Sequence, residues 1–122
     1  MTYFESLPPS CPDSDALPCN GTVYRLVSSL PCSEDFLSHR ALAPHKRFHV
    51  TECIACSVSV FANKEYLERL IGLPRHANKI IAEVDLKPLA GVIKKTGSTA
   101  DHFSWWRASH FNVLGAIKGV SK

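Results

Sequence analysis

The sequence predicts a small α+β domain built on a mixed or antiparallel sheet, with two short helices and an irregular N-terminal arm. Its 122 residues have the length of one domain, and the share of hydrophobic residues, 45%, is that of an ordinary globular chain. Short segments of alternating hydrophobicity indicate half-buried strands. Two segments with helical spacing lie between them, and the resulting order β-α-β-α-β-β-β is typical of the α+β class.

The first 21 residues differ from the rest in composition. They contain Pro8, Pro9, Pro12 and Pro18, half of the eight prolines of the chain. Proline and the residue before it favour extended or turn backbone. We therefore expect an irregular arm over 1–21 and a single α+β domain over 22–122.

Four elements are expected in the first half of the domain. Residues 22–27 are rich in β-branched and aromatic residues and predict a strand, and the strictly alternating segment 56–61 predicts a second one. Between them, Ser33 is a suitable N-cap for a helix over 34–41, followed by a polar loop. The clearest helix is predicted over 64–71.

That helix has both an apolar face and capping residues. Leu67, Leu70 and Ile71 recur at i, i+3 and i+4, Asn63 precedes the helix as a cap, and Gly72 follows it as a C′ residue. We expect Leu67 and Leu70 to pack against the sheet.

The second half of the domain predicts strands. Residues 79–86 alternate, and the apolar Ile81 on the polar side indicates that this side is partly covered. Short strands are expected over 92–94 and 102–106. A last strand is expected over 111–117, where apolar residues alternate around a glycine.

Composition also limits the location and the partners. Residues 1–15 lack the basic and apolar regions of a secretory signal, and the five cysteines are an odd number. We therefore expect a cytoplasmic protein with free or metal-bound thiols. No apolar run of about 18 residues exists, so no membrane partner is expected. A net charge of +3 falls short of a basic stripe, so nucleic acid is not an expected partner.

A C-x-x-C motif at Cys53 and Cys56 has three interpretations. With His45 and His49 upstream it could form a four-coordinate zinc site. It could be a redox pair, although such pairs need a helix N-terminus and this one precedes a strand. It could also consist of plain buried cysteines.

An arginine inside a predicted strand, Arg25, has two interpretations. Such a side chain needs an anionic partner unless it faces solvent. It could lie on a half-exposed sheet and pair with Glu83 or Asp85. Alternatively, its planar guanidinium could clamp a phosphate or another anion.

The densest aromatic segment contains His102, Trp105, Trp106 and Arg107. Neighbouring residues of a strand face opposite sides. We expect Trp105 to be buried and Trp106 to be exposed beside His102. Together with Arg107, the exposed ring would stack on a nucleotide-like ligand or bind a partner protein. The leading hypothesis is therefore a small binding or accessory protein.

Two stretches, Glu52–Phe61 and His102–Trp106, resemble a group of small bacterial proteins for which the resemblance implies no activity. The relatives carry two adjacent histidines, then Thr-Trp-Trp-Pro. Here Phe103, Ser104 and Arg107 replace the second histidine, the threonine and the proline. The resemblance covers roughly residues 22–107.

A more distant resemblance is to ADP-ribosyltransferase-like folds. Those have an early strand with Arg or His, a later Ser-x-Ser strand followed by a helix, and a late Glu. Arg25, Ser57, Ser59 and Glu83 occur in that order. The resemblance implies that Arg25 holds the pyrophosphate of NAD, the serines support the ribose, and Glu83 stabilises the oxocarbenium-like sugar. It defines the alternative hypothesis, an NAD-using transferase or glycohydrolase.

Overall fold

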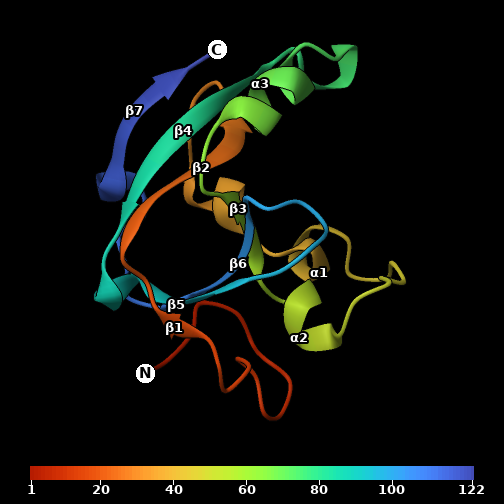
Figure 1. Cartoon of the computed structure of the whole chain (residues 1–122), viewed down its shortest axis with the longest axis vertical. Helices are drawn as coiled ribbons and strands as arrows, with labels where there is room; N and C mark the ends of the chain where they lie inside the picture. Colours follow the sequence, from red (N-terminus) through yellow and green to blue (C-terminus); the bar gives the residue numbers. More distant parts are fainter.

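The computed structural model describes all residues, 1–122, and contains one seven-stranded antiparallel sheet (Figure 1). The strands lie in the order β1 (Leu17–Pro18), β5 (Gly91–Lys95), β6 (His102–Arg107), β3 (Val58–Phe61), β2 (Gly21–Ser28), β4 (Lys79–Leu86) and β7 (Ile117–Ser121). The α+β class is confirmed, and the sheet is the antiparallel alternative.

A seam divides the sheet between β2 and β3. These two strands share one ladder pair, Tyr24 with Phe61, whereas β2 and β4 are paired along their full length. The main core nevertheless joins both halves, because Val27 and Val84 on one side and Val58 and Trp105 on the other belong to one buried cluster. The seam is therefore a local opening between strands that share a core.

Three short helices, one more than expected, cover the sheet: α1 (His39–Leu42), α2 (Glu52–Ala55) and α3 (Glu65–Ile71). Figure 1 shows α3 against β2 and β4, while α1 and α2 lie near β3 and β6. In α3, Leu67 is buried as expected and Leu70 is half-buried.

The helix expected over 34–41 is interrupted. A 3₁₀ turn occupies Ser33–Phe36, and α1 begins only after Ser38. Ser38 is the true N-cap, since its hydroxyl oxygen accepts the N–H of Ala41 at 3.0 Å. The helix α2 lies partly in the expected loop and is capped in the same way by Thr51.

Of the later strands, β4 agrees with the prediction and the last strand, β7, begins later than predicted. The strand β4 has the expected bounds, and the burial of Ile81 confirms that its outer face is covered. The last strand begins at Ile117 rather than at residue 111, because a 3₁₀ turn occupies Leu114–Ala116.

The arm is tied to the domain at several points. Leu17 pairs with Ile93 in the sheet, Tyr3 forms a bridge with Ala108, and Cys11 is joined to Cys53 by a disulfide. The expectation that all thiols are free or metal-bound is therefore wrong for these two cysteines. None of the helices is long and apolar enough to cross a membrane.

Candidate functional site

A serine and a histidine meet on the outer face of the sheet, where β3 pairs with β6. The Ser59 Oγ lies 2.5 Å from Nε2 of His102. The other ring nitrogen of His102, Nδ1, lies 3.1 Å from the carbonyl oxygen of Thr96. Because a carbonyl oxygen only accepts, Nδ1 carries the proton, and Nε2 is left to accept the hydroxyl proton of Ser59.

The surroundings of His102 favour its neutral form. Partial burial lowers the pKa of its imidazole, the bond to Thr96 opposes this in part, and the positive charge of Lys95 adds a smaller lowering. A neutral imidazole with a free Nε2 is a proton acceptor at neutral pH. Ser59 and His102 thus have the arrangement of a nucleophile and its base, with a backbone carbonyl as the orienting group.

Arg25 lies at the seam and binds three backbone carbonyls. Its Nε donates to Asp35 O at 2.7 Å, and its two terminal nitrogens donate to Ser59 O at 2.7 Å and Leu37 O at 3.3 Å. It makes no ion pair, so the expected pairing with Glu83 or Asp85 is wrong. Its side chain thereby joins β3, through Ser59, to the stretch that contains Asp35 and Leu37.

The charge of Arg25 is not neutralised by direct contact. Burial lowers the pKa of its guanidinium to about 10, which leaves it cationic at neutral pH. The nearby carboxylate of Asp35 is already bound by Ser28, and that of Glu5 by Ser38. Each terminal nitrogen of Arg25 has a second N–H, and these donors suit an anionic ligand.

The structure does not assemble the full set that the ADP-ribosyltransferase resemblance implies. Arg25 and Ser59 are in contact, but Glu83 lies on β4, opposite Tyr24, with β2 between it and β3. The nearest cation to Glu83 is the ammonium of Lys118 at 3.9 Å. The side chain that contacts Ser59 from the neighbouring strand β6 is His102.

The expected recognition patch is wrong, because both tryptophans are buried. Trp105 is 0% exposed and Trp106 is 1% exposed. The two rings do face opposite sides, as predicted, but α2 covers the outer one, and Nε1 of Trp106 donates to Cys53 O at 2.9 Å. Arg107 is 6% exposed and is bound by backbone carbonyls. Of the four residues only His102 reaches the surface.

The four proposed zinc ligands do not come together. Cys53 is in the disulfide, and Cys56 is buried with its thiol 3.5 Å from a Glu52 carboxylate oxygen. His45 and His49 lie on an exposed loop, and no group of three or more metal-binding side chains occurs in the chain. Burial and the Glu52 carboxylate raise the pKa of the Cys56 thiol to about 11, so it is an inert buried cysteine.

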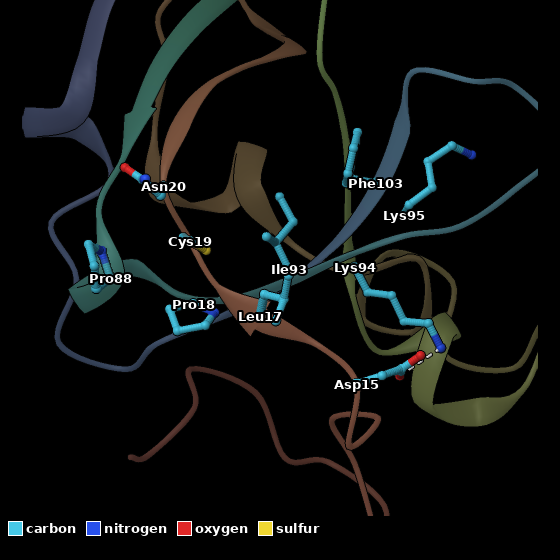
Figure 2. A pocket seen from close by; sticks show the side chains of 10 residues that line it. All are labelled: Asp15, Leu17, Pro18, Cys19, Asn20, Pro88, Ile93, Lys94, Lys95 and Phe103. Atoms are coloured by element: carbon cyan, nitrogen blue, oxygen red, sulfur yellow. Dashed lines mark ion pairs between the residues drawn. The ribbon is translucent and has the colours of Figure 1, made fainter.

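A hollow of about 900 Å³ lies beside β1 and β5, with Phe103 of β6 in its wall (Figure 2). Cys19, Ile93 and Phe103 supply apolar walls, and at one edge the ammonium of Lys94 lies 3.0 Å from a carboxylate oxygen of Asp15. Burial raises the pKa of the Cys19 thiol to about 12, so this hollow offers no nucleophile. It does not include Ser59 or His102.

No family model, curated protein or solved structure matches the chain. The chemistry of the site therefore has to be argued from its own residues. Sequence reasoning named Ser59 and His102 for two separate hypotheses and missed both their contact and the role of Thr96. The available signal was alternation: Val58 and Val60 are core residues, so Ser59 has to face away from the core.

Proposed function

We propose that the chain is a group-transfer enzyme in which Ser59 is the nucleophile and His102 is its base. The observation that carries this proposal is the 2.5 Å contact between Ser59 Oγ and His102 Nε2, with Nδ1 directed at a carbonyl. A serine hydroxyl is a weak nucleophile at neutral pH unless a neighbouring base takes its proton. His102 is within reach of that proton and is held in the required tautomer.

The reaction has two balanced steps. The Oγ of Ser59 forms a bond to the electrophilic centre of the substrate, its proton moves to Nε2 of His102, and the leaving group takes that proton as its bond breaks. In the second step, water or another acceptor gives a proton to Nε2 and attacks the same centre. The bond to Oγ then breaks, and the hydroxyl of Ser59 is restored with the proton from His102.

The positive charge beside Ser59 indicates an anionic substrate. Arg25 contacts the carbonyl of Ser59 and keeps unused N–H donors, and its charge has no carboxylate in contact with it. A phosphate-bearing substrate would supply the missing negative charge. The proposed substrate class is therefore a compound with a phosphate next to the group that is transferred.

A fluorophosphonate probe tests the proposal, since it reacts with serines that a base activates. We expect mass spectrometry of the labelled native protein to place the adduct on Ser59, and His102→Ala to slow labelling by about a hundredfold. Ser57→Ala is the matched control, because Ser57 lies on the same face of the chain but donates to Ile54 O instead of a histidine. Labelling of the Ser57→Ala variant should equal that of the wild type. Equal labelling of native and unfolded protein would overturn the proposal.

A second candidate function, NAD-using transferase or glycohydrolase, is supported by the order of the strands that carry the site. Arg25, Ser59 and His102 lie on β2, β3 and β6, which are consecutive in the sheet. In this reaction the bond between ribose and nicotinamide breaks with its electrons going to the nicotinamide nitrogen. The hydroxyl of water or of another acceptor forms the new bond to the ribose C1′ and gives its proton to Nε2 of His102.

Chromatographic measurement of nicotinamide released from NAD tests this second candidate. Release should be lost in His102→Ala and kept in Glu83→Gln, because Glu83 lies apart from the cluster. Loss of release in both variants would restore the role that the resemblance assigns to Glu83. Labelling of Ser59 without release of nicotinamide would exclude the second candidate function and leave the first as the remaining one.

A further inference from the structure

The segment 39–49, here called the basic loop, comprises α1 and the loop that follows it, and it concentrates basic residues. Six of its eleven residues are basic and none is acidic: His39, Arg40, His45, Lys46, Arg47 and His49. All of them except Arg40 are exposed. With the histidines neutral, Arg40, Lys46 and Arg47 give this segment a charge of +3, as large as the net charge of the whole chain.

The structure holds the basic loop in a defined shape. Nη1 of Arg40 donates to Pro44 O at 3.0 Å and to Lys46 O at 2.8 Å, and its Nε pairs with Glu52 at 2.8 Å. The ring of Phe48 lies 4.8 Å from the guanidinium carbon of Arg40 and 5.5 Å from the ammonium of Lys46. Arg40 is thus occupied within the protein, whereas Lys46 makes no ion pair.

The basic loop begins beside the proposed reaction centre. Arg25 donates both to Ser59 O, on β3, and to Leu37 O, two residues before the loop. His39, the first loop residue, has a lowered pKa, through burial first and then through the charges of Arg25 and His102. The start of the basic loop is therefore held next to β3 through Leu37, and the unpaired charge of the loop is carried by Lys46 and Arg47 farther along.

We infer that the basic loop binds the phosphate backbone of a single-stranded nucleic acid and leads it to Ser59. Lys46 and Arg47 are exposed and make no ion pair, and successive phosphates of one nucleic-acid strand offer each of them an anionic partner. A half-buried serine between strands is reached by a flexible single strand and not by a reacting group inside a duplex. Only the placement of the nucleic-acid strand at Ser59 rests on the proposed function; its binding to the basic loop does not.

Fluorescence anisotropy with labelled RNA and DNA strands of about 12 nucleotides tests this inference. The Ser59→Ala protein is used so that nothing reacts. Replacing Lys46 and Arg47 by Glu should weaken binding by about tenfold or more and reduce the slope of log K against log salt by about 1.4. The matched control replaces Lys64 and Lys79, two exposed lysines outside the basic loop, by Glu.

The control variant has the same net charge and should bind within about threefold of the parent. Equal weakening in both variants, or no binding at low salt, would overturn the inference. Inorganic polyphosphate that competes as well as the oligonucleotide would also overturn it, because the surface would then bind any polyanion. Fluorophosphonate labelling of Ser59 is measured separately on the Lys46 and Arg47 variant, so failure of the inference is distinguishable from failure of the proposed function.

Discussion

His102 contacts Ser59 along a diagonal of the β3–β6 ladder rather than directly across it. The residue opposite Ser59 is Ser104, and the residue opposite His102 is Phe61. The imidazole reaches back along the strand to Ser59, and the ring of Phe61 meets it edge-on with centroids 5.3 Å apart. With Thr96 O at Nδ1, the ring is held on three sides, so its orientation is set before any substrate binds.

The pH dependence of Ser59 labelling should report His102. Its pKa is lowered, so the neutral, proton-accepting form persists to a pH below the ordinary histidine value of about 6.5. The labelling rate constant should rise through one ionisation with a midpoint below that value and stay flat above it. Rates measured between pH 4 and 9, in buffers of constant ionic strength, check this. A midpoint near pH 8 or higher would show that His102 is not the base.

Thiol titration should distinguish the cysteines. Cys32 is the exposed free cysteine, Cys19 and Cys56 are buried, and two more form the disulfide. We expect Ellman's reagent to react with one thiol in the native protein, with three after unfolding without reductant, and with five after reduction. Five reactive thiols in unfolded, unreduced protein would contradict the disulfide.

Truncation of the outer tryptophan should destabilise the fold strongly. Trp106→Ala leaves a large cavity under α2 and an unpaired Cys53 carbonyl, so the free energy of unfolding should fall by about 3–5 kcal/mol. Denaturant titration measures this. Leu89→Ala is the control, because Leu89 is 81% exposed, and its effect should stay within about 0.5 kcal/mol. Similar small effects of both changes would contradict the burial of Trp106 and indicate that its side chain is exposed.

Two glycines in the sheet should differ sharply in their tolerance of alanine. Gly91 has φ +126°, and a Cβ there would lie 2.1 Å from Trp106 O. Gly119 has no atom within 4 Å of the same position. Gly91→Ala should lower the free energy of unfolding by about 3 kcal/mol or more, and Gly119→Ala should change it by less than about 1 kcal/mol. Thermal and denaturant unfolding of the two variants provide the comparison, and equal losses would contradict the close approach at Gly91.

Periodicity predicted the elements that bury one face along their whole length. The strand β4 and the helix α3 are such elements. The helix α2 has only four residues, so its stability comes from contacts such as the disulfide and the cover over Trp106. The prediction for Trp106 was wrong for the same reason, because alternation gives the side of a strand and not what covers that side.

The candidate site was harder to predict than the elements that carry it. Ser59 and His102 are 43 residues apart, and their contact depends on the pairing of β3 with β6, which are not consecutive in the chain. Nδ1 of His102 lies 3.1 Å from the carbonyl oxygen and 3.2 Å from the hydroxyl oxygen of Thr96, and the sequence does not indicate that this loop residue lies beside the histidine. Arg25 was correctly singled out as unusual, but its partners are carbonyls, which any residue supplies.

Arg25 and Arg107 both bind the backbone of the stretch 33–37. Arg25 binds the carbonyls of Asp35 and Leu37, and Arg107 binds those of Ser33 and Phe36 at 3.1 Å each. The carbonyl bonds alone would hold any side chain, but Ser33 Oγ also accepts from Arg107, the Asp35 carboxylate binds Ser28, and Phe36 is buried in the core. Aligned relatives should therefore vary at the two remaining positions of this stretch, Glu34 and Leu37, where the protein uses the backbone and not the side chain.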